Sequence, residues 1–191
     1  MLAARWPVLA LLLVVPAGCA SLTPAQQTHL ADLKVFAQTV TLAHGKPDVK
    51  LMPMEPGDST VPLAAIRSDG MLLISTELLR GTSLGQFTYD LSLFATAHEL
   101  GHYITGRYGC PACEMDANAE AVKILVIGRG MSEREAFDLV AGMLSLTASM
   151  QGLGSPVMAG HPSACAELAN LAGRYPSFGV EMPPACKSMR R

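Results

Sequence analysis

The apolar residues of this chain fall mainly at the spacing of amphipathic or buried helices. One helix is predicted to begin at Thr23 and Pro24, a typical helix start, and to end before Gly45. A later stretch around Phe94 is apolar nearly all round, which is typical of a buried helix. The predicted helices are about 24–44, 88–105, 112–127, 132–150 and a shorter one at about 163–172.

Two short apolar runs, about 49–54 and 71–74, are predicted to be strands. A turn at Asp69 and Gly70 precedes the second run, and a short helix follows it as far as Leu79. These elements predict an α+β fold that is mostly helical, with a small sheet beside the long buried helix.

The long buried helix contains an HExxH pattern formed by His98, Glu99 and His102. Residues four apart lie nearly above one another on a helix, so both imidazoles can bind one metal ion while Glu99 projects from the adjacent flank. Burying an ionisable group costs free energy unless the group is paired or binds a metal ion. The polar residues of this buried helix are therefore better explained as a metal site than as two core histidines that are merely hydrogen-bonded. His29 and His44, in contrast, are predicted to be surface residues.

A metal held by two histidines needs at least one more protein ligand. Glu114 is the preferred candidate because it lies on a face of small and apolar residues that can pack against the HExxH helix. Asp116 and Glu120 lie on the opposite side together with Lys123, and these three are predicted to form a solvated face. Asn118 is predicted to hydrogen-bond a ligand and to orient it.

Composition is compatible with one globular domain and gives no basic surface for nucleic acid. The chain has 191 residues, half of them apolar, and a formal net charge of -2. Residues 1–18 are predicted to be a secretory signal, because Arg5 precedes a short apolar stretch and a small-residue exit. The remaining residues, 19–191, are predicted to form a single domain after a short tether.

Cys19 directly follows Ala17 and Gly18, a pattern similar to a bacterial lipobox, in which this cysteine is acylated after cleavage. Pro16 departs from the usual Leu, and the alternative is ordinary signal cleavage nearby, with Cys19 left as a free thiol or removed. Ala20 is not the Asp that tends to retain such proteins at the inner membrane. The prediction is an exported lipoprotein that its acyl chains anchor to the outer membrane, facing the periplasm.

Four cysteines remain without Cys19, an even set for which two disulfides are expected in an exported chain. The sequence does not choose a pairing among Cys110, Cys113, Cys165 and Cys186. The CxxC pair among them could instead join the two HExxH histidines in a closed structural zinc site. A thioredoxin-like redox role lacks the expected βαβ context.

HExxH followed by E-x-x-A-N-x-x-A, which begins at Glu114, resembles the gluzincin metallopeptidases. Two further stretches, 69–79 and 160–162, are similar to the strand with its short helix and to the His-Pro motif of the HtpX/Oma-like peptidases. That family includes the periplasmic BepA- and LoiP-like members. The resemblance covers about 49–171.

Three features depart from the family pattern. Asn118 stands where an Asp is usual, and the interval from His102 to Glu114 is unusually short, although it still allows a tight helical hairpin. Glu167 lies near the position at which the family has an Arg after its His-Pro pair.

The resemblance implies a zincin-type domain with one zinc per chain, bound by His98, His102 and Glu114. Glu99 would then take a proton from water at the zinc, and His161 would lie near the metal, where it stabilises the oxyanion or closes the site. The strand at 71–74 would be the sheet edge on which a polypeptide substrate adds as an extended strand.

The function expected from these features is that of a zinc endopeptidase that hydrolyses misfolded or misassembled proteins of the bacterial envelope. One alternative is a non-catalytic assembly factor that binds unfolded strands and holds a structural zinc. Another is a partner-docking lipoprotein, whose methionine-rich segment 143–158 would support docking.

Overall fold

The computed structural model describes residues 22–54, 63–80, 86–155, 157 and 161–188, so the predicted signal and Cys19 lie outside the described residues. The elements follow in the order α1 (Pro24–Ala43), β1 (Lys50–Met54), β2 (Ala64–Ile66), β3 (Met71–Ser75), α2 (Thr76–Leu79), α4 (Gln86–Thr105), α5 (Pro111–Arg129), α6 (Glu133–Gly152), α7 (Ala164–Arg174) and α8 (Pro184–Ser188). The prediction of a mostly helical α+β fold with a small sheet is confirmed.

The sheet has three strands in the order β1-β3-β2. β1 runs parallel to β3, and β2 runs antiparallel to it. The prediction that the strand at 71–74 forms an edge is therefore wrong, because β3 is paired on both sides. The edge next to β3 is β2, which sequence reasoning missed because its three residues are too few to display an alternating pattern.

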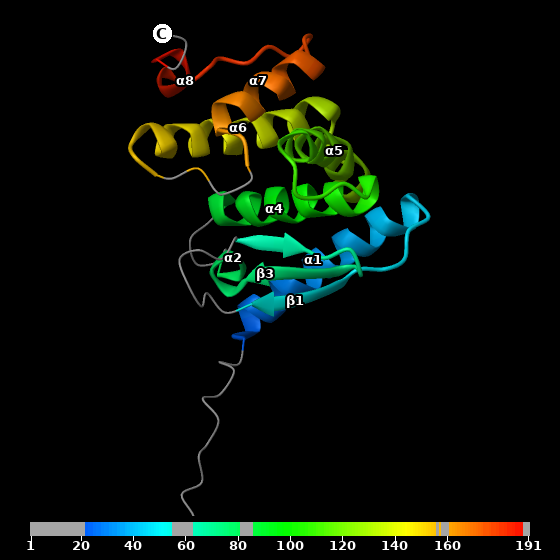
Figure 1. Cartoon of the computed structure of the whole chain (residues 1–191). Coiled ribbons are helices and arrows are strands. Elements are labelled where there is room, and N and C mark those ends of the chain that lie inside the picture. The colour runs from blue at the N-terminus through cyan, green and yellow to red at the C-terminus, as the bar shows by residue number, and fades with distance from the viewer. Residues whose placement is uncertain (1–21, 55–62, 81–85, 156, 158–160, 189–191) are drawn as a thin grey trace, which may run out of the picture.

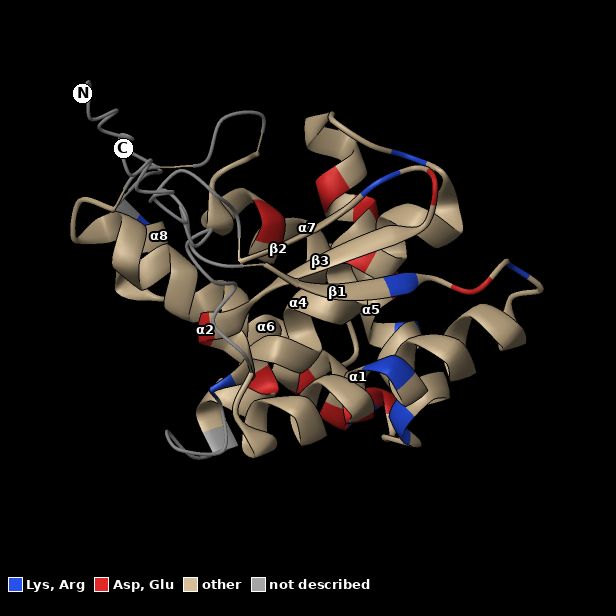
Figure 2. Cartoon of the chain, turned by 90° about the horizontal axis from the view of Figure 1, so that it is seen from below, with Lys and Arg blue, Asp and Glu red and all other residues tan. Residues whose placement is uncertain are grey.

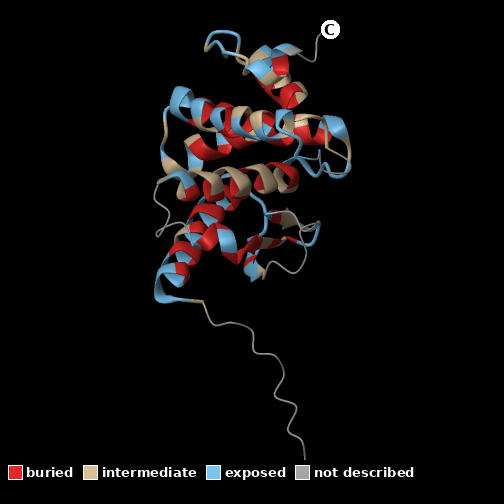
Figure 3. Ribbon diagram, turned by 90° about the vertical axis from the view of Figure 1, so that its left-hand side faces the viewer, coloured by how far each residue is buried: buried red, intermediate tan, exposed pale blue. Residues whose placement is uncertain are grey.

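α4 is the central helix of the fold. Figure 1 shows it between the sheet with α1 on one side and the helices α5, α6 and α7 on the other. Its apolar residues Leu93, Ala97 and Leu100 are fully buried in the main core, which explains why the stretch is apolar nearly all round. Figure 3 shows buried residues along the facing sides of the helices and exposed residues on their outer sides. The HExxH residues are thus held inside the molecule.

The helix ends follow from local side-chain hydrogen bonds. Ser132 and Glu135 form the predicted capping box at the start of α6, and Thr23 and Gln26 form another at the start of α1. α5 begins at Pro111, with Cys110 as its N-cap. Among the described residues, no helix combines the length and the apolar character that a membrane crossing requires.

α4 and α5 approach each other closely where Gly101 faces Ala117. A Cβ atom built on Gly101 would lie 2.8 Å from the carbonyl oxygen of Ala117, which is too short for a real contact. The glycine inside the HExxH motif therefore lets the two helix backbones approach. This contact brings the first turn of α5 beside the imidazoles of α4.

His29 is buried, so the prediction that it is a surface residue is wrong. Its side chain lies between α1 and α4, where Nε2 is 2.8 Å from Oγ of the fully buried Ser92. A bidentate ion pair between Asp32 and Arg129 links α1 to α5 nearby, and Tyr89 donates a hydrogen bond to the same carboxylate. Figure 2 shows acidic and basic positions close together around α1 and α5. His29 can lie in the core because Ser92 of α4 is its hydrogen-bond partner, a contact that the sequence of α1 does not reveal.

Candidate metal centre

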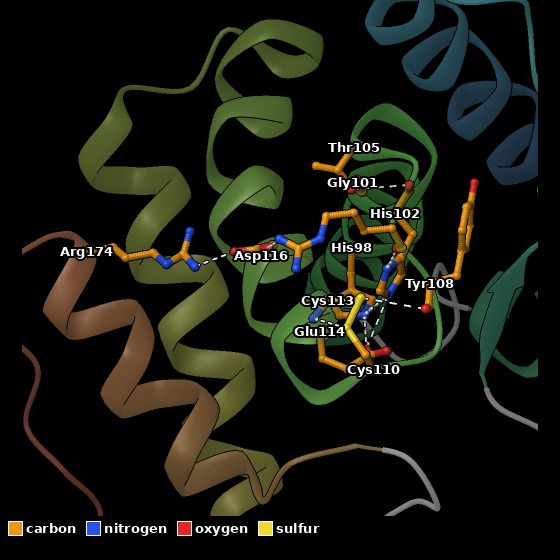
Figure 4. Close-up of a disulfide and its surroundings, with 11 residues drawn as sticks. His98, Gly101, His102, Thr105, Tyr108, Cys110, Cys113, Glu114, Asp116 and Arg174 are labelled. Carbon is orange, nitrogen blue, oxygen red and sulfur yellow. Dashed lines mark hydrogen bonds and ion pairs between the residues drawn. A yellow bond between two sulfur atoms is a disulfide. The ribbon is translucent and has the colours of Figure 1, made fainter.

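Three side chains from α4 and α5 converge on one point. Glu114 Oε2 lies 3.1 Å from Nε2 of His98 and 3.2 Å from Nε2 of His102. The two Nε2 atoms are 3.2 Å apart. Figure 4 shows the imidazoles and the carboxylate pointing toward one another from the two helices. These three residues form a group that can hold a metal ion.

The size of the group fits a small metal ion with tetrahedral coordination. Ligand atoms at about 2.0–2.1 Å from a tetrahedral centre lie about 3.3–3.4 Å from one another. The observed separations of 3.1, 3.2 and 3.2 Å are close to that value. Little movement of the side chains is therefore needed to accommodate such an ion.

The outer nitrogen of each imidazole has an acceptor as its partner. His102 Nδ1 lies 2.7 Å from the carbonyl oxygen of Arg107, which can only accept, so Nδ1 carries the proton. His98 Nδ1 lies 2.9 Å from Oδ1 of Asn118 and donates to it in the same way. Both Nε2 lone pairs thus face the carboxylate of Glu114. Three acceptors this close repel unless a cation or a proton lies between them.

Charge in the group is strongly coupled. Burial opposes protonation of His98, but the hydrogen bond to Glu114 and the charges of Glu99 and Glu114 outweigh it and raise the pKa of His98. Burial also opposes ionisation of Glu114, but its contacts with His102 and His98 hold the pKa of its carboxyl far below the ordinary value. Protons therefore balance the carboxylate when no metal is bound, and metal binding would displace them.

Glu99 points from α4 toward the sheet. Its Oε2 accepts a hydrogen bond of 2.9 Å from the backbone N–H of Ile66 in β2. Leu63 and Arg67 bond to β3, so the alternate residues Ala64 and Ile66 direct their backbone groups toward the free side of β2, on which no strand among the described residues pairs. Burial raises the pKa of the Glu99 carboxyl, although the neighbouring imidazoles and the Ile66 amide oppose the rise. A carboxyl with a raised pKa beside a metal site is suited to accept a proton.

His161 contacts the cluster from the segment between α6 and α7. Its Nδ1 lies 3.2 Å from Oε2 of Glu114, and its ring centroid is 6.5 Å from that of His98. Its side chain is 30% exposed. Burial lowers its pKa, and the charge of Glu114 opposes the change. The structure therefore brings His161 beside Glu114, at the rim of the site.

The opposite face of α5 is not solvated as predicted. Asp116 forms ion pairs with Arg107 and with Arg174 of α7, and its side chain is largely buried (Figure 4). Glu120 pairs with Lys123 at 2.7 Å, and of the two only Lys123 is exposed. The acids of this face point away from the metal-binding group, as the helical geometry predicts. Their burial was missed because α7 covers this side of α5, a tertiary contact without a local sequence signal.

Two disulfides join the four cysteines of the described chain. Cys110 is bonded to Cys113 across the first turn of α5, and Cys165 of α7 is bonded to Cys186 of α8. Because the sulfur atoms of the CxxC pair are bonded to each other, they are not free to complete a closed zinc site with the histidines. The first disulfide fixes the turn that carries Glu114, and the second fixes the C-terminal segment against α7.

Sequence reasoning assigned no role to Glu167. This residue lies in the first turn of α7 and is buried, and its Oε2 accepts a hydrogen bond of 3.3 Å from Nδ2 of Asn118. Burial raises the pKa of its carboxyl to about 7. The one available sequence signal was an acid shortly after the His-Pro pair, but its direction toward Asn118 depends on how α7 packs on α5.

No family model, curated protein or solved structure matches this chain. The resemblance to the HtpX/Oma-like peptidases therefore depends on the motifs alone. The geometry of the metal-binding group carries the functional conclusion.

Proposed function

We propose that this protein is a zinc-dependent endopeptidase of the bacterial envelope. The observation that carries the proposal is the convergence of three acceptor atoms, from His98, His102 and Glu114, at separations of 3.1–3.2 Å. The outer nitrogens of both imidazoles are bonded to oxygens, which leaves only the inner nitrogens to bind a cation.

Zinc is the ion that best matches this set of donors. Two imidazoles and one carboxylate, close to tetrahedral separations, are the ligands of many catalytic zinc sites. Three protein ligands leave one coordination position open, which a structural site with four protein ligands lacks. The proposal is one zinc per chain.

The chemistry requires a proton acceptor next to the metal position. Bound zinc would polarise the substrate carbonyl and make water a nucleophile at neutral pH. Glu99 accepts the proton of the attacking water and delivers it to the leaving amine as the peptide bond breaks. His161, beside Glu114 at the rim, is the candidate for a donor to the carbonyl oxygen during the attack.

The free side of β2 gives the proposed substrate a place to bind. The backbone groups of Ala64 and Ile66 face this side, next to Glu99. An extended polypeptide can pair with them as an additional strand once it displaces Glu99 from the Ile66 N–H, with its scissile bond directed toward the metal position. Misfolded or misassembled proteins expose such extended segments, which makes them the proposed substrates.

The proposed location is the periplasmic side of the outer membrane, with acylated Cys19 as the anchor. Disulfides persist in oxidising compartments, so the pairs Cys110–Cys113 and Cys165–Cys186 support export. The formal net charge of -2 gives no reason to propose nucleic acid as a partner.

The test is the substitution Glu99→Gln, which keeps the size of the side chain and removes the proton acceptor. The purified variant is expected to retain its zinc and to lose at least about 100-fold of its activity on a denatured protein substrate. Glu133→Gln makes the same chemical change at an exposed position in the first turn of α6 and is expected to keep full activity. Full activity of Glu99→Gln would contradict the peptidase proposal, and an unchanged cellular phenotype would favour the non-catalytic assembly factor.

A further inference from the structure

A buried hydrogen-bonded chain connects α7 to the metal-binding group. Glu167 is 8% exposed, and its Oε2 lies 3.3 Å from Nδ2 of Asn118. The other end of the same amide, Oδ1 of Asn118, lies 2.9 Å from Nδ1 of His98. Asn118 is itself 1% exposed, so no solvent competes for either end of its side chain.

The orientation of the Asn118 amide decides which nitrogen of His98 carries the proton. With Oδ1 toward His98, the imidazole donates from Nδ1 and keeps the Nε2 lone pair for a metal ion. The amide rotated by a half-turn would present Nδ2, a donor, to Nδ1. His98 would then need its proton on Nε2, the atom that points at Glu114 and at the metal position.

The amide does not choose between these orientations by itself, because its oxygen and nitrogen ends are nearly the same size and shape. The carboxylate of Glu167 provides the distinction. Above its pKa of about 7 this group is ionised and can only accept, so it attracts Nδ2 of Asn118 and would repel Oδ1 in the rotated orientation.

We propose that Glu167 is a positioning residue of the metal centre, which holds the Asn118 amide so that His98 presents its Nε2 lone pair to the metal. This inference rests on the proposed zinc site and names the residue that prepares one of its ligands. It assigns to Glu167 a function that the HExxH motif and Glu114 do not include.

The position of α7, which carries Glu167, is fixed by several contacts. Ser163 caps the N-terminus of α7. Leu168 and Leu171, which follow Glu167 along this helix, are fully buried in the main core. The disulfide between Cys165 and Cys186 fixes the same turn of α7. Glu167 therefore reaches Asn118 from a packed helix and not from a loop.

The first experiment compares the zinc affinity of the purified full chain and its variants by competition with a chromophoric chelator. Glu167→Ala is expected to bind zinc about 10–100-fold more weakly, the usual effect of losing a residue that orients a ligand histidine. Glu167→Gln places an amide at this position that can turn either its oxygen or its NH₂ toward Asn118 and so no longer selects one orientation, and it is also expected to weaken zinc binding, by less than Glu167→Ala. Glu133→Ala, in the exposed first turn of α6, is the control and is expected to leave the affinity unchanged.

The second experiment repeats the comparison with Asp at position 118, made by Asn118→Asp. An aspartate presents an acceptor to His98 whichever way it rotates, so the dependence on Glu167 is expected to vanish. Adding Glu167→Ala to Asn118→Asp is expected to leave zinc affinity unchanged or to improve it, since two adjacent carboxylates repel. Equal losses in both backgrounds would show only a packing role and would overturn the proposal, as would a Glu167→Ala protein with the affinity of the parent.

The tautomer of His98 gives a readout that requires no metal. In the zinc-free chain, at a pH where the imidazole is neutral, ¹⁵N NMR is expected to place the proton on Nδ1 in the parent and to shift it toward Nε2 in Glu167→Ala. The same tautomer in both proteins would overturn the positioning role. A parent chain that binds no zinc but shows this shift would overturn the proposed function and leave the positioning role standing.

Discussion

His98 and His102 are held in one tautomer by oxygens outside the metal-binding group. The carbonyl oxygen of Arg107 and the side-chain oxygen of Asn118 each accept from an Nδ1 atom. The inner nitrogens therefore face Glu114, and once the protons that balance this carboxylate leave, their lone pairs are directed at the metal position. Such preorganisation reduces the reorganisation that metal binding would otherwise require.

Glu167 gives a prediction about pH and stability in the zinc-free chain. Burial raises the pKa of its carboxyl from the ordinary value of 4.5 to about 7 in the folded protein. The folded state then binds more protons than the unfolded state between these values, so this residue lowers the free energy of unfolding as pH rises. Glu167→Gln is expected to stabilise the protein by about 1–3 kcal/mol at about pH 8 and by little at about pH 4.

Urea unfolding of the zinc-free parent and of Glu167→Gln at both pH values measures this difference. A stability difference that does not change with pH would contradict the raised pKa of Glu167. Glu133→Gln is the matched control, because it makes the same chemical change at an exposed position in the first turn of α6.

The site residues differ in how far the sequence reveals them. His98, Glu99 and Glu114 were identified because helical periodicity places them on defined faces of long helices. Glu167 and Ile66 were not, because each reaches the site through contacts between elements that are distant in sequence. Local patterns contain no information about those contacts.

The tight hairpin of α4 and α5 allows His102 and Glu114 to meet at one site although few residues separate them in the sequence. α4 ends at Thr105 and α5 begins at Pro111, so the connection between them is only a few residues long. The absence of a side chain at Gly101 then lets the two helices approach at Ala117.

Gly101→Ala tests this close approach. The added Cβ would meet the Ala117 carbonyl oxygen at 2.8 Å, so the helices must separate and the ligands must move. The variant is expected to lose about 1–3 kcal/mol of stability, and zinc affinity is expected to fall because the ligand atoms separate. Thermal unfolding and chelator competition measure the two effects.

Gly142→Ala is the matched control for Gly101→Ala. Gly142 also lies within a helix, α6, but a Cβ atom added there meets nothing within 4 Å. Alanine is the better helix former, so this variant is expected to gain up to about 1 kcal/mol of stability and to bind zinc as the parent does. A Gly101→Ala protein that behaved like Gly142→Ala would refute the role assigned to the glycine.

At the level of elements, the long helices were predictable and the sheet was predictable only in part. α1, α4, α5 and α6 lie close to their predicted bounds because each combines helical spacing with a clear start or stop signal. β2 was missed, and β3 was wrongly placed at an edge, because strand order is decided by pairing between segments and not by the composition of either strand.

The whole molecule combines a helical core with two disulfides near its C-terminal half. The α+β class was predictable from the sequence, and so was the even set of cysteines. The pairing of Cys110 with Cys113 and of Cys165 with Cys186 was not, because it depends on how α7 and α8 pack.

Free-thiol counting on the denatured, unreduced chain tests the covalent organisation. We expect at most one reactive thiol, that of Cys19 where it is not acylated, because the other four cysteines are paired. A sample reduced before denaturation is the control and should release the four paired thiols as well. Four reactive thiols in the unreduced chain would exclude both disulfides and would weaken the proposal of an exported protein.

The most direct measurement of the central claim is the zinc content of the purified chain by elemental analysis, with Glu114→Ala and Glu120→Ala beside it. We predict about one zinc per chain in the parent and in Glu120→Ala, and a clear loss in Glu114→Ala, because Glu114, unlike Glu120, reaches the two histidines. A folded parent without zinc, even after the metal is added back, would contradict the proposed zinc site. So would a protein that keeps its zinc without Glu114 and loses it without Glu120.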